Sequence, residues 1–100
     1  MIRGTTPTVV LKLQTDLQMS EMKQIWVTFK NLVHESTYNK AQIEIVDNSL
    51  VLQLSQEDTL NFAEGEVKVQ VRLLTAIDKA YATNIKTLPV DQILKEGVIA

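Results

Sequence analysis

The sequence is poor in the residues that usually mark a special site, with no cysteine, three glycines and five aromatic residues among 100. The absence of cysteine excludes disulfides, thiolate nucleophiles and cysteine metal sites. The glycines are too scattered to cradle a phosphate. No apolar run approaches the roughly 20 residues that a membrane-spanning helix needs, and the N-terminus has no signal-peptide pattern. We therefore expect a soluble protein with no membrane segment.

Charge and hydrophobic content further limit the class of protein to which this sequence can belong. Ten Lys and Arg residues against twelve Asp and Glu residues give a net charge of -2, so no global field attracts nucleic acid or an anionic membrane. A hydrophobic content of 45% is enough for one compact core. The sequence predicts a single domain over residues 1–100.

The dominant pattern is strict alternation, which is typical of half-buried strands. In residues 66–74, four apolar residues alternate with Lys68, Gln70 and Arg72. Polar turn residues at 47–49 predict a hairpin between two of the strands. The predicted strands cover residues 8–14, 24–30, 41–46, 50–54, 66–74 and 81–88.

Two short helices are expected beside the strands. One crosses between strands at residues 55–61, and the other begins at Pro89, where proline suits the first helical position, and ends near Gly97. Strands this short, with polar turns between them, predict a mainly β fold, an antiparallel β-sandwich, with a small β-barrel as the alternative.

Four carboxylates gather between residues 54 and 66: Glu57, Asp58, Glu64 and Glu66. A calcium loop needs oxygen ligands at alternating positions around a glycine, and this segment lacks that spacing. Ser55 and Asp58 instead have the spacing of a capping box at a helix start. We therefore predict a capped crossover that buries Phe62 and enters the next strand at Gly65, and no metal site.

Catalytic constellations are equally scarce. The single histidine, His34, is interpreted as a solvated loop residue, because no partner for it is evident from the sequence. The serines lack a nucleophile-elbow context. We expect no catalytic residue, no cofactor and no small-molecule ligand, and hence a protein that is not an enzyme.

Large apolar residues that break the alternation are the most informative feature, because a misplaced apolar side chain calls for an explanation. Either the C-terminal segment folds back over them, or they and that segment form a protein interface. The candidate interface residues are Val10, Trp26, Val51 and Leu74 in the strands, with Ile93, Val98 and Ile99 in the C-terminal segment.

A basic strand face gives the competing hypothesis. Lys12, Lys30, Lys68 and Arg72 are all expected to point outward, and together with Trp26 they could bind single-stranded nucleic acid. Outward charges also keep a sheet soluble and discourage edge pairing, and this interpretation is favoured. The alternative function is thus a small regulatory or nucleic-acid-binding module.

Three stretches carry a family resemblance. They are Arg3-Gly4-Thr5-Thr6-Pro7-Thr8, Leu54-Ser55-Gln56-Glu57-Asp58-Thr59-Leu60-Asn61-Phe62, and Thr83-Asn84-Ile85 followed by Asp91-Gln92-Ile93-Leu94-Lys95-Glu96-Gly97-Val98-Ile99. Together they resemble small proteins from tail-gene regions of prophages of Gram-positive bacteria. The order of elements is similar to the immunoglobulin-like N-terminal domain of phage baseplate upper proteins. Asp78-Lys79 departs from the Asp-Gly turn of such relatives, which predicts a longer loop at residues 75–80.

The resemblance implies an immunoglobulin-like sandwich that serves as a phage structural or tail-assembly module. Its partners would be other tail proteins or further copies of itself. Its location would be the host cytoplasm during assembly and, beyond that, the virion. No catalytic residue belongs to the resemblance, so none is transferred to this sequence.

Overall fold

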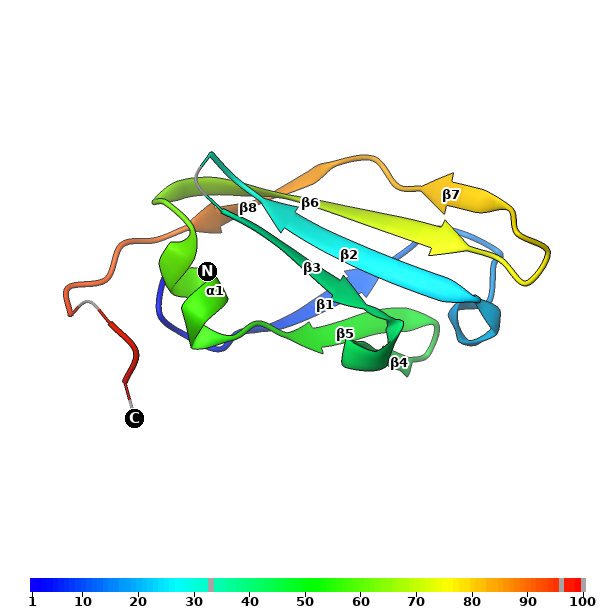
Figure 1. Ribbon diagram of the computed structural model, residues 1–100, viewed down its shortest axis with the longest axis horizontal. Helices are drawn as coiled ribbons and strands as arrows, with labels where there is room; N and C mark the ends of the chain where they lie inside the picture. The colour runs from blue at the N-terminus through cyan, green and yellow to red at the C-terminus, as the bar shows by residue number, and fades with distance from the viewer. Residues whose placement is uncertain (33, 96, 100) are drawn as a thin grey trace.

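The computed structural model describes residues 1–32, 34–95 and 97–99, and shows two antiparallel sheets packed face to face (Figure 1). The predicted antiparallel β-sandwich is therefore confirmed. The strands are β1 (Thr8–Lys12), β2 (Gln24–Lys30), β3 (Glu35–Asn39), β4 (Glu44–Val46), β5 (Ser49–Gln53), β6 (Gly65–Leu74), β7 (Ala80–Ala82) and β8 (Lys86–Val90). The helical elements are α1 (Gln56–Asn61) and two 3-10 turns, η1 (Met19–Glu21) and η2 (Lys40–Gln42).

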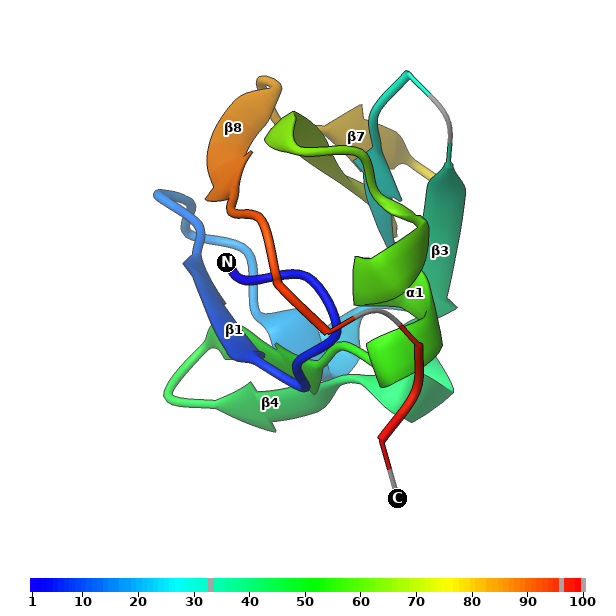
Figure 2. The same ribbon diagram turned by 90° about the vertical axis from the view of Figure 1, so that its left-hand side faces the viewer.

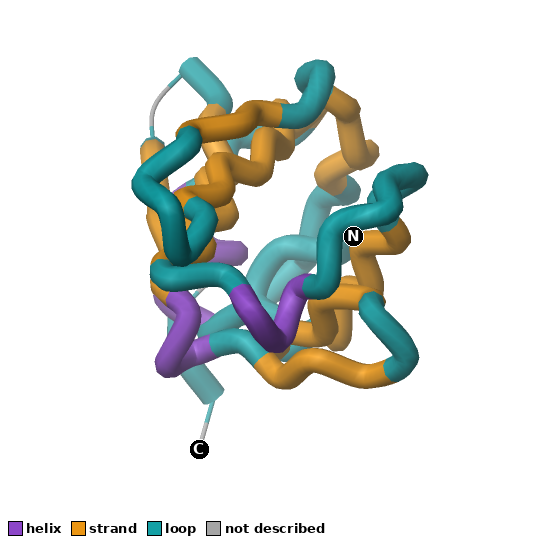
Figure 3. Tube along the Cα trace, turned by 90° about the vertical axis from the view of Figure 1, so that its right-hand side faces the viewer, coloured by secondary structure: helices purple, strands orange, loops and turns teal. Residues whose placement is uncertain are grey.

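The strand order is that of an immunoglobulin sandwich. The smaller sheet runs β1-β5-β4, and the larger one runs β3-β2-β6, with β7 and β8 both paired to the far side of β6. These orders match the B-E-D strands of one immunoglobulin sheet and the C-F-G strands of the other, with β3 added beside C. Views from the two ends of the molecule show the two layers of strands (Figures 2 and 3).

The alternation predicted from the sequence places the core between the layers. Ile25, Val27 and Phe29 of β2 are buried and face Leu50 and Leu52 of the smaller sheet within one cluster. Val67, Val69, Val71 and Leu73 of β6 are buried, and the residues between them point outward. The buried residues of both sheets form one continuous core cluster.

The hairpin between β4 and β5 forms as predicted. Val46 pairs with Ser49 across a turn whose two central residues, Asp47 and Asn48, have φ values of 48° and 62°. These two residue types tolerate the left-handed backbone that a tight hairpin turn requires. The Asn48 side chain also accepts a hydrogen bond from the Met19 backbone N–H at 2.7 Å. This bond fixes the start of η1 against the hairpin.

The predicted C-terminal helix is wrong. Pro89 lies inside β8, opposite Glu66, and residues 91–95 and 97–99 are not helical; Glu96 lies outside the described residues. The cause is a competing pattern: Leu88 and Val90 alternate toward the core, and a helix of two turns has little intrinsic stability. β8 is an edge strand, where proline is tolerated.

Two further strand predictions need correction. The segment expected as one strand at residues 81–88 is divided into β7 and β8 by residues 83–85. The strand expected at 41–46 is only β4, since η2 takes up Lys40–Gln42 and is capped by the Asn39 side chain. Alternation did not predict β3, an edge strand in which Tyr38 is the buried residue.

The parts of the resemblance at residues 3–8, 54–62, 91–95 and 97–99 meet at the α1 end of the sandwich. Thr83-Asn84-Ile85 lies instead between β7 and β8, where Thr83 Oγ1 accepts from the Val71 N–H at 3.1 Å. Arg3 donates to the carbonyl oxygens of Leu60 (2.7 Å) and Phe62 (2.9 Å) at the end of α1. A Cβ atom on Gly4, which has a φ of 74°, would lie 3.0 Å from Ile93 Cδ1. Arg3, Gly4 and Ile93, which belong to the resemblance, therefore help to hold this end of the scaffold together.

Candidate interaction surfaces

The outer face of the smaller sheet carries apolar side chains in contact with solvent. Because Leu50 and Leu52 of β5 point into the core, alternation turns Ser49 and Val51 outward. Val51 is paired with Val10 of β1, which is 54% exposed. Val46 of β4 lies on the same face and is 44% exposed. The candidate interface residues Val10 and Val51 thus lie side by side, with Val46 as a third member.

The strand register arranges this face as two rows of three residues. In the order β1, β5, β4, one row is Val10, Val51, Glu44, and the next is Lys12, Ser49, Val46. Val10 and Val46 therefore occupy two opposite corners, and Lys12 and Glu44 occupy the other two. We call these six residues the β1–β5–β4 face.

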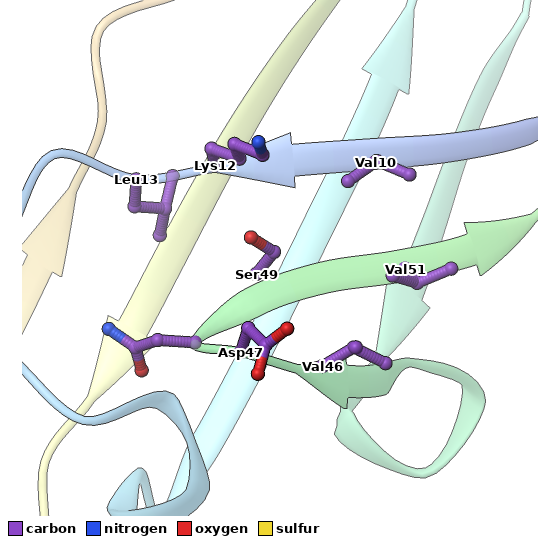
Figure 4. A pocket seen from close by; sticks show the side chains of 8 residues that line it. Val10, Lys12, Leu13, Val46, Asp47, Ser49 and Val51 are labelled. Carbon is purple, nitrogen blue, oxygen red and sulfur yellow. The ribbon is translucent and has the colours of Figure 1, made fainter.

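An open hollow lies on this face between β1 and the β4–β5 hairpin (Figure 4). Its walls combine aliphatic side chains with charged ones at the rim. The lining residues are Val10, Lys12, Leu13, Val46, Asp47, Asn48, Ser49 and Val51. The buried Ser49 lies in the middle of this lining, and aliphatic side chains beside polar and charged ones are common in protein-contact patches.

Trp26 and Leu74 lie on a different surface, the outer face of the larger sheet. Both are half-buried, and they line a hollow together with Thr28, Arg72 and Ala80. Trp26 is directly opposite Arg72 in the β2–β6 register. The four residues that break the alternation therefore form two pairs on opposite sides of the molecule.

The C-terminal segment lies against α1 (Figure 2). The Gln56 side chain donates to the Ile99 carbonyl oxygen at 3.0 Å and accepts from the Ile99 N–H at 2.9 Å. Ile93 is half-buried, whereas Val98 and Ile99 are exposed. Over the described residues this segment stays at the α1 end, so the idea that it folds back over Val10, Trp26, Val51 and Leu74 is wrong.

His34 is not a solvated residue without a partner. Its Nε2 lies 3.1 Å from Asp58 Oδ1, and its ring meets the Phe62 ring edge-on with centroids 5.1 Å apart. Ser36 donates to Asp58 Oδ2 at 2.9 Å, and the Tyr38 hydroxyl donates to the same oxygen. One carboxylate on α1 thus binds three side chains from β3 and the residue before it. The sequence could not reveal this, because the partners lie 20 to 24 positions from Asp58.

This cluster shifts the pKa values of two groups. Burial of Asp58 acts to raise its pKa, but hydrogen bonds from Tyr38, His34 and Ser36 outweigh burial and lower it. Burial raises the pKa of Tyr38, and its hydrogen bond to Asp58 raises it further. Asp58 is therefore held as a carboxylate and Tyr38 as a neutral hydroxyl.

The acidic segment forms the predicted capped turn, with one difference. The Ser55 hydroxyl oxygen accepts from the Asp58 N–H at 3.1 Å, as expected at a helix start. The Asp58 carboxylate binds β3 and does not complete a capping box. Glu57, Glu64 and Glu66 are exposed. Among the described residues, no three His, Cys, Asp or Glu side chains gather as metal ligands.

The basic residues do not share one surface. Lys30 and Lys68 are paired on the outer face of the larger sheet. Arg72 lies on the same face, four residues beyond Lys68 along β6. Lys12 lies on the other sheet. Glu35 is directly opposite Lys30 and reduces the positive charge of that face.

Glu44 and Val46 were not among the predicted interface residues, but the sequence contained a signal for them. Ile43 and Ile45 were expected to point inward, so the same alternation turns Glu44 and Val46 outward. Which strand they would lie beside depends on the register, which alternation alone does not determine.

Comparison of the chain with protein-family models, with curated proteins and with solved structures found no match. No helix in the described part of the chain is long and apolar enough to cross a membrane.

Proposed function

We propose that this protein is a non-enzymatic structural or assembly module of a phage tail or baseplate, acting through protein–protein contacts on the β1–β5–β4 face. The observation that carries the proposal is that Val10, Val46 and Val51 lie on one outer sheet face, where Val10 and Val46 are exposed and Val51, paired with Val10, is half-buried. A contiguous apolar patch with a charged rim is typical of a surface that binds another protein.

The phage assignment is supported by the resemblance to tail-region and baseplate proteins. The matching residues Gly4, Ile93 and Leu60 lie together in the α1 end of the scaffold. The proposal places the protein in the host cytoplasm while the tail is assembled, and it extends to the virion.

The non-enzymatic part of the proposal is supported by the chemistry of the His34 cluster. Ser36 and Tyr38 both donate to Asp58, so neither hydroxyl is placed to give its proton to His34. A nucleophile needs a base within hydrogen-bond reach. The arrangement is that of a support between β3 and α1.

The test is binding to the purified tail proteins encoded next to this one, measured by calorimetry. Val10→Lys places a charge in the apolar patch and should weaken binding at least about tenfold, because an unpaired charge would be desolvated in the contact. The melting temperature should stay unchanged, since Val10 is exposed.

Ile85→Lys is the matched control, because Ile85 is also a β-branched residue, 58% exposed, and it lines a hollow on the larger sheet. It should leave binding intact. Loss of binding on Ile85→Lys or Trp26→Lys, with Val10→Lys unaffected, would move the contact to the other sheet and contradict the proposed surface.

A second candidate function is favoured by one observation: Trp26, Lys30, Lys68 and Arg72 share the outer face of the larger sheet. On such a face, Trp26 could stack on a base and the basic side chains could neutralise the phosphates of a single-stranded nucleic acid. Trp26 is the only tryptophan, so its fluorescence reports on this surface directly. Quenching by oligonucleotides that weakens with salt would support this function, and flat titrations at low salt would remove it.

A further inference from the structure

We propose that the β1–β5–β4 face binds a second copy of this chain in a twofold dimer. The inference rests on the proposed function, because it names the partner of the same surface. It follows from the positions of two apolar and two charged residues at the four corners of this face.

The face is complementary to itself. Val10 and Val46 define one diagonal of the face, and Lys12 and Glu44 lie on either side of that diagonal. When two copies meet face to face about a twofold axis along this diagonal, the apolar diagonals lie on each other. Lys12 of each copy then comes opposite Glu44 of the other. In a twofold interface each contact occurs twice, so this geometry gives two intermolecular ion pairs.

Both charges are available for these pairs. Lys12 and Glu44 are exposed, and neither forms an ion pair or a side-chain hydrogen bond within the described part of the chain. Unpaired opposite charges beside an apolar surface fix the register of association and disfavour other partners. A contact with a different surface would not require Lys12 and Glu44 to lie on opposite sides of the Val10–Val46 diagonal.

The size of the face sets the expected strength. Three strands of three to five residues offer much less than the roughly 800 Å² per partner of a standard interface. We therefore expect a weak dimer that forms at concentrations on the order of 100 μM, with fast exchange between monomer and dimer. Copies held close together in an assembly would dimerise through the same face.

The experiment is sedimentation equilibrium of the wild type, of Lys12→Glu and of Glu44→Lys, each alone and then as an equal mixture of the two variants. Each single variant puts like charges opposite each other at both symmetry-related positions, and should raise the dimer dissociation constant at least about tenfold. In the mixture, the variant with two acids meets the variant with two bases, so heterodimers should form at least as well as the wild-type dimer. Lys68→Glu and Glu64→Lys, which change exposed charges away from this face, should dimerise like the wild type.

Restoration in the mixture supports the proposed dimer. A wild type that stays monomeric at millimolar concentration would overturn it, as would a mixture no better than the single variants. If the wild type were monomeric while Val10→Lys still abolished binding to a tail protein, the dimer would be refuted and the proposed function would stand.

Discussion

Phe62 and Asp58 are close neighbours in the turn after β5, yet they stabilise the fold in different ways. Phe62 is fully buried and its ring contacts the edge of His34. Asp58 is half-buried and collects hydrogen bonds from Ser36, Tyr38 and His34. The acidic segment thus contributes one apolar anchor and one polar anchor, while its other three acids remain in solvent.

Removal of the apolar anchor should be costly. Phe62→Ala should lower the free energy of unfolding by about 3–5 kcal/mol, because it leaves a cavity at a fully buried aromatic position. Glu64→Ala, two residues away and exposed, should change it by less than about 0.5 kcal/mol. Urea denaturation of both variants measures the difference. Equal effects would show that Phe62 is not a core residue.

The polar anchor should make stability depend on pH. The pKa of Asp58 in the folded protein is below its ordinary value of 3.8, so its contribution is fully present above that value and is lost as the pH falls through the folded pKa. Denaturation of the wild type should therefore become easier as the pH falls below about 4, and Asp58→Asn should lose less stability over the same range. Identical pH profiles for the two proteins would contradict the role of the carboxylate.

At the scale of the elements, alternation predicted β1, β2, β5 and β6 because one face of each is buried. It failed for β3, whose residues Glu35–Asn39 are polar apart from Tyr38. An edge strand that contributes a single side chain to the core carries no periodic signal. It failed again after residue 88, where helix signals at Pro89 and Gly97 were outweighed by burial of Val90.

The candidate surface was predicted only in part for a related reason. Period two shows that Val10 and Val51 point away from the core, but it does not show that β1 and β5 are neighbours or that Trp26 is on the other sheet. Which strands are neighbours, and which sheet holds Trp26, depend on strand order and register. Strand order and register also place Glu44 and Lys12 at opposite corners of one face.

On the scale of the whole molecule, the sandwich has two outer faces of different character. The larger sheet presents basic and aromatic residues partly balanced by Glu35, and the smaller sheet presents valines with one base and one acid. The α1 end is occupied by the chain's own N-terminal and C-terminal segments. Among these surfaces, the β1–β5–β4 face is the one that we propose as the contact with a protein partner.

The most direct measurement is a dilution series followed by amide chemical shifts of the isotope-labelled protein. The shifts that change with concentration should map to β1, β4 and β5, centred on Val10, Val46 and Val51, and should disappear in Val10→Lys. Changes centred on Trp26 and Leu74 would contradict the account and place the contact on the larger sheet.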